Sequence, residues 1–330
     1  MRSVNSSQEK FEKLFSDQLP TEDAKKFLIE LYDKGETADD IAMAASIMRE
    51  HSIKLPIPKT LQDRAIDVVG TGGDKSGSFN ISTTVSLLLA SLGSVVAKHG
   101  SRSITSNSGS ADLLEALGIN LNMTPAQQVE MLEESGFCFI FAMNHHPAMR
   151  HIMPIRKSIE HRTIFNILGP LTNPAGAKKY LLGVFSPDYI ERMAEALLEL
   201  DVTRAYVVSS DDGMDEISLA TTTQFAYVES SRVSQGVIDP EAYGFRLAPK
   251  EAILGGSATD NAIITRDILS GAEHGAKRDI VILNAMFALF ADGKVRDLQE
   301  AKEMASTALD SGIAIEHLQR IIEASQRVES

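Results

Sequence analysis

Acidic side chains cluster in the run Asp211-Asp212-Gly213-Met214-Asp215-Glu216, directly after the apolar stretch Arg204 to Ser209. The apolar stretch predicts a strand, and carboxylates at the carboxyl end of a strand lie where α/β sheets bind their ligands. Mg²⁺ prefers a few protein carboxylates together with water and substrate phosphate oxygens. The run by itself is better explained as an exposed acidic turn, so a Mg²⁺ site here requires a phosphate site nearby.

A glycine loop supplies the first candidate phosphate site. Gly70-Thr71-Gly72-Gly73-Asp74 lies between the apolar runs Ala65 to Val69 and Ile81 to Leu92, which predict a strand and a helix. Glycine lets backbone N–H groups approach an anion, and the following helix directs its positive N-terminal end toward the loop. The letters fit neither G-x-G-x-x-G, since Lys75 holds the sixth position, nor a Walker A loop. Taken alone, the loop would be interpreted as a tight turn.

A second strand-to-helix loop is rich in positive charge. Lys98-His99-Gly100-Ser101-Arg102 precedes the hydroxyl-rich run Ser103 to Ser110. Cationic side chains beside hydroxyls and a helix start can bind phosphate oxygens through charge-assisted hydrogen bonds. The loop follows the glycine loop by roughly thirty residues, the length of one βαβ unit. Together the two loops predict one polyanionic ligand held between them.

Histidines are concentrated in the stretch Asn144 to His151, which includes His145 and His146. Zinc needs convergent ligands, and no cysteine or close carboxylate completes a set here, so a zinc site is not favoured. A serine hydrolase is not favoured either. Ser108 lacks the glycine two residues upstream that the G-x-S-x-G pattern requires.

Composition limits the class of protein. With 330 residues the chain exceeds a usual single core, which predicts one large domain and a smaller one. The net charge is -13, from 45 acidic and 32 basic residues, so the overall field repels nucleic acid and anionic membranes. We therefore expect neither as a partner, and an anionic substrate would need a local basic pocket.

The single cysteine, Cys138, excludes an intramolecular disulfide framework and a multi-cysteine metal site. Its apolar neighbours predict a place in the core. Residues Met1 to Lys10 lack the apolar segment of a signal peptide, and no window approaches the length of a membrane span. We expect a cytoplasmic location.

Helical spacing of apolar residues predicts three short helices at Gln8 to Ser16, Thr21 to Asp33 and Thr37 to His51. Thr37 and Asp40 resemble a capping box. The proline-containing segment that follows reads as an extended linker, so the prediction is a small helical domain over residues 1–64.

From Ala65 onward, short β-branched runs alternate with amphipathic helices, which predicts an α/β domain over residues 65–330 with a mostly parallel central sheet. Thr124-Pro125 predicts a helix start with proline at its first position, and Ser186-Pro187 predicts another. The tail from Thr259 is predicted to be largely helical. The other predicted strands are Ser94 to Ala97, Phe137 to Ala142 and Tyr180 to Phe185, and a helix is predicted over Gly109 to Leu117.

The chain resembles the anthranilate phosphoribosyltransferase family from the N-terminal helices to the tail. The most specific matching stretches are Gly70 to Asp74, Asn80 to Thr83, Lys98 to Ser110, His145 to Arg156, Arg162 to Pro174 and Asp215-Glu216. The resemblance implies the nucleoside phosphorylase and phosphoribosyltransferase type of architecture, with a hinge near residues 163–180 that could pack with the helical domain. It implies a homodimer formed through the N-terminal helices. The implied reaction transfers phosphoribose from 5-phosphoribosyl 1-pyrophosphate (PRPP) to anthranilate in tryptophan biosynthesis.

The resemblance also implies a role for individual residues. Two Mg²⁺ ions would be held by Ser82, Asp215 and Glu216. Anthranilate would meet Gly70, His99, Ser101, His146 and Arg156, with the arginine on its carboxylate. Asp215, Glu216 and His99 would be catalytic, His99 as a candidate base only. PRPP would bind Gly70, Gly73, Asp74, Ser78, Asn80, Ile81, Ser82, Thr83, Lys98, Arg102, Ser106 and Ser110.

Ser101 departs from the family, which usually has asparagine after Lys-His-Gly, and this puts one side-chain contact to anthranilate in doubt. Two alternatives stay open. A pyrimidine nucleoside phosphorylase shares the architecture, although the acidic pair and the stretch His145 to Arg156 favour the transferase. A nucleic-acid-binding relative needs a basic face, which is at odds with a net charge of -13.

Overall fold

The computed structural model describes residues 6–102 and 108–327. Within these residues the chain forms a seven-stranded sheet in the order β3-β2-β1-β4-β5-β6-β7. Strands β1 to β5 pair in parallel, which confirms the predicted mostly parallel sheet. The strands are β1 (Ala65–Gly70), β2 (Val95–Gly100), β3 (Phe137–Phe141), β4 (Lys179–Gly183), β5 (Arg204–Ser210), β6 (Thr223–Glu229) and β7 (Arg232–Ile238).

The hairpin formed by β6 and β7, which pair antiparallel at one edge of the sheet, was not predicted from the sequence. Ser230 and Ser231 join the two strands with φ values of 52° and 60°. A two-residue turn with positive φ at both residues matches the right-handed twist of the two strands that it joins. Asparagine followed by glycine is the usual sequence of such a turn. Two serines give a much weaker turn signal.

The strand order places a topological switch between β1 and β4. From β1 the chain builds outward through β2 and β3, and it then returns to the other side of β1 as β4. In open α/β sheets, ligands bind outside the carboxyl ends of the strands at such a point. Gly70 and Gly183 are register partners there, so both strands end without a side chain.

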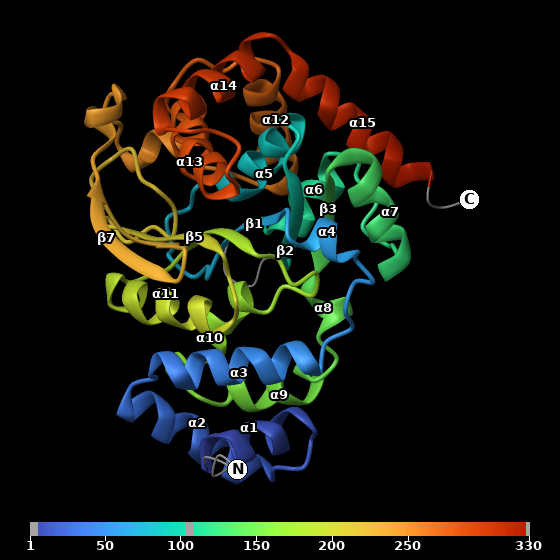
Figure 1. Cartoon of the computed structure of the whole chain (residues 1–330), viewed down its shortest axis with the longest axis vertical. Helices are drawn as coiled ribbons and strands as arrows, with labels where there is room; N and C mark the ends of the chain where they lie inside the picture. Colours follow the sequence, from blue (N-terminus) through green and yellow to red (C-terminus); the bar gives the residue numbers. More distant parts are fainter. Residues whose placement is uncertain (1–5, 103–107, 328–330) are drawn as a thin grey trace.

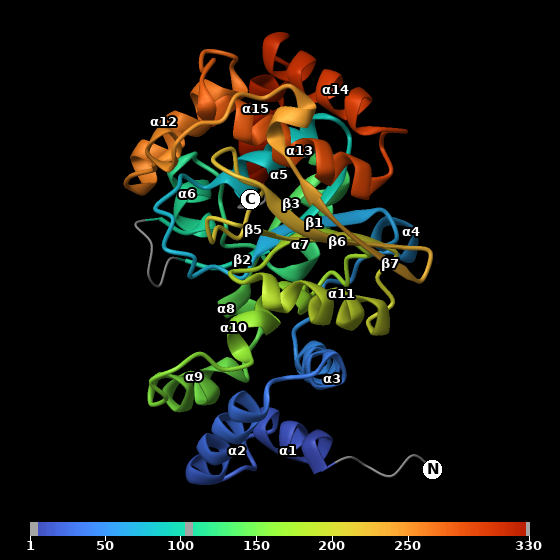
Figure 2. The same ribbon diagram turned by 90° about the vertical axis from the view of Figure 1, so that its left-hand side faces the viewer.

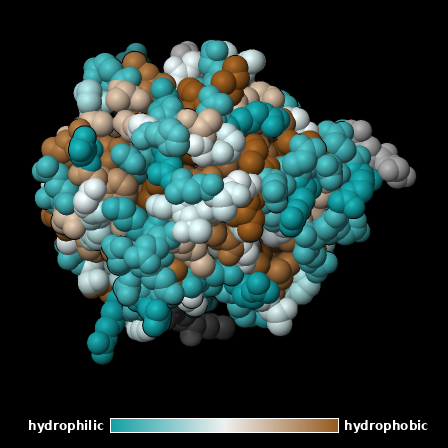
Figure 3. Space-filling model, turned by 90° about the horizontal axis from the view of Figure 1, so that it is seen from above, coloured by the Kyte–Doolittle hydropathy of each residue, from teal (hydrophilic) through white to brown (hydrophobic). Residues whose placement is uncertain are grey.

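Helices cover both faces of the sheet (Figure 1). Ile66 and Val68 of β1 lie in the core beneath α5 and α12–α15, whereas Ala65 lies in the opposite core with α11. Cys138 is buried in that second core, as expected. The outer surface over the upper helices is largely hydrophilic, with hydrophobic residues between (Figure 3). These helices are α5 (Ile81–Ser91), α11 (Ile190–Glu199), α12 (Ala258–Leu269), α13 (Ala276–Asp292), α14 (Leu298–Asp310) and α15 (Ile313–Arg327).

Several helix starts follow from their capping residues. The Thr37 side chain and Asp40 form the predicted capping box at α3 (Ala38–Glu50). Thr124 with Gln127 forms another at α7 (Pro125–Ser135), where Pro125 is the first residue. Ser186 caps the short turn that leads into α11. The remaining short elements are α4 (Lys59–Gln62), α6 (Ser110–Ala116), α7 (Pro125–Ser135), α8 (Ala142–His145), α10 (Phe165–Leu168), η1 (Gly169–Leu171), η2 (Pro187–Tyr189), η3 (Pro240–Tyr243) and η4 (Lys250–Ile253). No helix in the described ranges is long and apolar enough to cross a membrane.

A helical body lies below the sheet and shares the second core with it (Figures 1 and 2). It contains α1 (Ser6–Phe15), α2 (Thr21–Lys34) and α3 (Ala38–Glu50), together with α9 (Met149–Lys157) from the segment after β3. Ile152 and Ile155 of α9 share a core with the first three helices. Two distant stretches of chain thus build this body, and the division into residues 1–64 and 65–330 stays a prediction.

Candidate active site

The loop that carries the acidic pair packs against the ends of β1 and β4. Gly72 donates its backbone N–H to Oδ2 of Asp215 at 2.6 Å. A Cβ at Gly70 would lie 2.2 Å from that oxygen, and a Cβ at Gly183 would lie 1.6 Å from the carbonyl oxygen of Asp215. Any side chain at these positions would collide with the acidic loop. Glycine at both strand ends therefore lets the carboxylates reach the switch point.

Glu216 connects the acidic pair to α5 and β2. Ser82 donates its backbone N–H to Oε1 of Glu216 at 3.2 Å. Lys98 donates from Nζ to the carbonyl oxygen of Val68 at 2.6 Å and lies 3.5 Å from Oγ of Ser82. Lys98 is buried, and burial lowers the pKa of its ammonium group although nearby carboxylates raise it. We call Ser82, Lys98, Asp215 and Glu216 the strand-end cluster.

The two carboxylates of the strand-end cluster favour their protonated forms. Burial raises the pKa of Asp215 to about 7 and that of Glu216 to about 8, and the neighbouring Asp74 carboxylate adds to both shifts. A bound cation would reverse this effect, because its charge stabilises ionised carboxylates.

The donor set of the strand-end cluster fits Mg²⁺. No three His, Cys, Asp or Glu side chains of the described residues are grouped to hold a metal by themselves. Two carboxylates and the Ser82 hydroxyl leave coordination positions for phosphate oxygens and water. Mg²⁺ is usually bound in this way, whereas zinc prefers nitrogen and sulfur ligands.

The remaining predicted phosphate-binding residues lie in the two strand-to-helix loops and the helix starts. Thr83, in the first turn of α5, donates from its hydroxyl to Oγ of Ser110 at 3.0 Å. Asn80 donates from its amide to the carbonyl oxygen of Ser108 at 3.1 Å. These hydrogen bonds hold the two loops together at the same sheet edge. The other residues of this set are Gly73, Asp74, Ser78 and the buried Ile81.

The rings of His99 and His146 contact each other. Nδ1 of His99 lies 3.1 Å from the carbonyl oxygen of Gly169, which can only accept, so Nδ1 carries the proton of the neutral ring. Nε2 of His146 lies 3.2 Å from Nε2 of His99 and therefore donates to it. Burial lowers the pKa of His146 to about 4 and that of His99 well below its usual range. Nδ1 of His146 is left as a buried acceptor with no partner among the described residues.

The rest of the basic loop lies apart from the strand-end cluster. Nη1 of Arg102 lies 2.9 Å from Oδ1 of Asp112 and 2.6 Å from Oε2 of Glu115, both on α6. The exposed Ser101 donates its hydroxyl to the carbonyl oxygen of Arg102 at 3.0 Å. Ser106 lies outside the described residues. Of this loop, Lys98 and His99 are the residues that the observed contacts bring into the site.

Arg156 lies on α9, in the helical body. Its side chain is partly buried, and burial lowers its pKa. Among the described residues, none forms a hydrogen bond or an ion pair with the Arg156 side chain. The guanidinium group therefore has unused donors, but no contact links it to His99 or His146.

Other residues at the site had no individual role predicted from the sequence, although Arg162 and Gly169 lie in the matching stretch Arg162 to Pro174. Asp67 accepts a hydrogen bond from the His99 backbone at 3.2 Å, and Arg162 donates to the carbonyl oxygen of Gly73 at 2.9 Å. Asp67 interrupts the apolar run Ala65 to Val69. This position is the one available sequence signal that Asp67 has a partner, because unpaired carboxylates are rarely buried. Gly169 acts through its carbonyl oxygen, which no residue pattern reveals.

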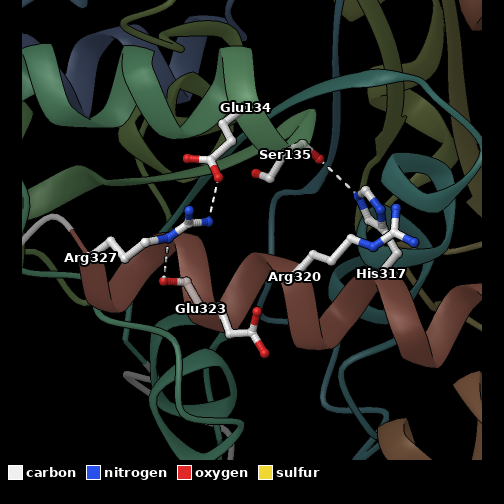
Figure 4. Close-up of a pocket in the computed structure, with 6 residues that line it drawn as sticks. All are labelled: Glu134, Ser135, His317, Arg320, Glu323 and Arg327. Carbon is white, nitrogen blue, oxygen red and sulfur yellow. Dashed lines mark hydrogen bonds and ion pairs between the residues drawn. The ribbon is translucent and has the colours of Figure 1, made fainter.

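A pocket of about 240 Å³ between α7 and α15 is remote from these residues (Figure 4). Its walls carry Glu134, His317, Arg320 and Arg327. Arg327 pairs with Glu134, and His317 donates from Nε2 to the carbonyl oxygen of Ser135 at 2.8 Å. None of the predicted site residues lines this pocket.

Comparison with known proteins identifies relatives along most of the chain. Residues 62–315 match the glycosyl transferase family, a/b domain. A curated anthranilate phosphoribosyltransferase from Rubrobacter xylanophilus is 44% identical over 295 residues, which cover 89% of this chain and 85% of the relative.

Two solved structures have the same fold. The anthranilate phosphoribosyltransferase of Thermus thermophilus superposes with a TM-score of 0.91 at 41% identity, covering 97% of this chain and 94% of that one. The Saccharomyces cerevisiae enzyme in complex with PRPP and Mg superposes with a TM-score of 0.87 at 25% identity, covering 98% and 94% of the two chains.

Proposed function

The chain belongs to the anthranilate phosphoribosyltransferase family, and we propose that its strand-end cluster transfers the phosphoribosyl group of PRPP to anthranilate. The products are N-(5-phosphoribosyl)anthranilate and diphosphate, and the reaction is a step of tryptophan biosynthesis. The bond from ribose C1 to the diphosphate oxygen breaks, the anthranilate nitrogen bonds to C1, and that nitrogen loses a proton. The observation that carries the proposal is the contact of Glu216 with Ser82, which joins the acidic pair to the phosphate loops.

We assign Mg²⁺ to Ser82, Asp215 and Glu216, with two ions as the proposed number. The yeast relative was solved with PRPP and Mg, which supports the use of this metal. When bound, the cation stabilises the negative charge that develops on the departing diphosphate. Ser82 also donates its backbone N–H to Glu216, and this contact holds the carboxylate beside the start of α5.

The phosphate groups of PRPP are assigned to the two strand-to-helix loops. Backbone N–H groups around Gly73 and the start of α5 would donate to phosphate oxygens, and Lys98 would supply a buried positive charge. Arg102 would have to exchange its two carboxylate partners on α6 for phosphate oxygens. The hydrogen bond between Thr83 and Ser110 supports a single ligand that spans both loops.

Anthranilate is assigned to the side of the site that holds Gly70, His99, Ser101 and His146, with Arg156 on the carboxylate. Its amine is a neutral nucleophile, so orientation toward C1 contributes more than activation. The lone pair of His99 Nε2 already accepts from His146, which favours an orienting role for His99 over proton removal. Nδ1 of His146 has no partner among the described residues. This supports a hydrogen bond to Nδ1 from a ligand donor, such as the amine N–H of anthranilate.

Two further assignments concern the whole chain. We propose a homodimer through the N-terminal helices and a hinge near residues 163–180 between the helical body and the sheet domain. Contacts of this segment with both parts support the hinge: Arg49 of α3 donates to the carbonyl oxygen of Leu171 at 2.7 Å, and Asn173 donates to Asp67 of β1 at 2.8 Å.

The deciding experiment incubates the protein with PRPP, Mg²⁺ and anthranilate and follows the loss of anthranilate fluorescence. We expect consumption only when all three are present, and addition of EDTA should stop it. Thymidine with phosphate is the control for a nucleoside phosphorylase. Phosphorolysis of thymidine without anthranilate turnover, or turnover unaffected by EDTA, would overturn the proposal.

A further inference from the structure

The carboxylate of Asp67 is buried in the sheet. Asp67 is 0% exposed and lies on β1. Its Oδ1 accepts the backbone N–H of His99 at 3.2 Å, and its Oδ2 accepts from the Asn173 amide at 2.8 Å. A buried carboxylate is costly unless each oxygen is hydrogen-bonded, and both oxygens are. Asp67 is thus linked to one residue of the predicted acceptor site and to one residue of the hinge segment.

Asn173 uses its whole side chain in this arrangement. Its Nδ2 donates to Asp67 and also to the carbonyl oxygen of Ala97 at 2.7 Å, and its Oδ1 accepts the backbone N–H of Ala175 at 2.9 Å. The residue is 1% exposed. It therefore inserts from the hinge segment between β1 and β2.

These side chains replace part of the sheet itself. Register pairs between β1 and β2 run only from Ala65–Val95 to Ile66–Val96, whereas β2 stays paired with β3 as far as Gly100. Beyond Ile66, side chains bridge the two strands: Asp67 and Asn173 do so together, and Lys98 reaches the carbonyl oxygen of Val68. The end of β2, which carries Lys98 and His99, is thus placed relative to β1 by side chains rather than by the sheet ladder.

We propose that Asp67 and Asn173 are positioning residues for the phosphoribosyl acceptor, acting through the backbone of His99. The inference rests on the proposed function, because it requires His99 to contact the acceptor. Gly169, whose carbonyl oxygen fixes the His99 ring, belongs to the same segment as Asn173. The hinge segment thus holds His99 at two points, one on the ring and one, through Asp67, on the backbone.

The test is a double-mutant cycle. An amide at position 67 offers one acceptor oxygen to two N–H donors, so Asp67→Asn should lower kcat/KM for anthranilate by about tenfold or more. In a His99→Ala background the same change should cost less than about twofold, because its target is already gone. Asn173→Ala is the second variant, which leaves the Asp67 side chain in place and replaces Asp67→Asn if that protein does not fold.

The matched control is Asp292→Asn. Asp292 is another buried carboxylate, 2.8 Å from Nζ of Lys179, which begins β4 and thus lies at the opposite end of the strand from the site. Asp292→Asn should lower the thermal midpoint as Asp67→Asn does, and it should leave kcat/KM for anthranilate within about twofold.

Equal losses from Asp67→Asn with and without His99 would show general destabilisation and overturn the inference. An unchanged kcat/KM for anthranilate in the His99→Ala protein would also overturn the inference. The proposed function would still stand in that case, provided that the wild-type protein consumes PRPP and anthranilate. Failure of the proposed function would appear separately, as a wild-type protein that does not consume anthranilate.

Discussion

Nε2 of His146 lies 3.2 Å from Nε2 of His99, and this contact determines which nitrogen of each ring carries a proton. His99 must donate from Nδ1 to Gly169, so its Nε2 accepts from His146. His99 must therefore be neutral, because its Nε2 accepts, and a proton on the buried Nδ1 of His146 would find no acceptor among the described residues. Burial, which lowers the pKa of both rings, acts in the same direction.

Replacing His146 should change the acid side of the stability profile. The folded-state pKa of His146 is lowered to about 4, below the unfolded value of about 6.5, so its contribution is present above pH 6.5 and lost as pH falls toward 4. His146→Gln should therefore gain stability relative to wild type between about pH 6.5 and 4.5, by roughly 2 kcal/mol. Thermal midpoints across this range measure the difference. The same change at the exposed His274 is the control, and parallel profiles for His146→Gln and wild type would contradict the prediction.

Glu216 should affect the stability profile with the opposite sign, as pH rises from about 5 to 8. Burial raises the folded-state pKa of Glu216 to about 8, above its unfolded value near 4.3, so the folded protein binds the extra proton and loses stability as pH rises between the two values. Without metal, Glu216→Gln should gain stability relative to wild type from about pH 5 to 8. Denaturant unfolding in EDTA checks this. A constant difference at all pH values would show that the pKa of Glu216 is not raised in the folded protein.

Glu216→Gln should also reduce catalysis. The amide keeps the shape of the side chain and removes a charge directed at Mg²⁺, so kcat should fall by at least about tenfold at saturating Mg²⁺. Steady-state rates with Glu50→Gln, a change at an exposed carboxylate of α3, provide the comparison. A wild-type rate for Glu216→Gln would place the metal elsewhere.

Arg156→Ala should weaken the use of anthranilate far more than the use of PRPP. The guanidinium group has no partner among the described residues, and its proposed partner is the acceptor's carboxylate. KM for anthranilate should rise by about tenfold or more, and KM for PRPP should change little. Arg150, exposed on the same helix, is the matched control. Equal effects on both substrates would indicate a structural role.

Ser101→Asn should change KM for anthranilate by less than about tenfold, because one neutral hydrogen bond contributes roughly 0.5–1.5 kcal/mol. Ser101 is exposed and bonds to the neighbouring carbonyl oxygen of Arg102, so the substitution disturbs no buried contact. Competition between anthranilate and aromatic amines without the ortho carboxylate measures specificity. A shift of several orders of magnitude toward anthranilate would mean that the native acceptor is a different amine.

Local signals predicted much of the fold. The capping residues Thr37 and Thr124 start helices where expected, and the apolar runs after Ala65 form parallel strands. The hairpin after β5 was missed because its turn, Ser230-Ser231, uses positive φ without the residues that usually adopt it.

The site was harder to predict where it depends on burial and distant partners. The sequence pointed to Lys98 and Arg102 as equal members of a basic loop, yet Lys98 is buried in the strand-end cluster and Arg102 pairs with α6. Asp67 and Asn173 lie 106 positions apart, and no sequence pattern pairs them, so their hydrogen bond follows only from tertiary structure.

The helical body also sets an order of events during synthesis. Met149 begins α9 roughly a hundred residues after α3 ends at Glu50. At about 5–20 residues per second, the ribosome needs several seconds to synthesise the chain as far as α9. During this time the apolar side chains that α9 will cover remain exposed to solvent. Phe11 and Leu14 of α1 belong to that shared core. The nascent N-terminal helices therefore stay accessible to a chaperone for several seconds before α9 can pack against them.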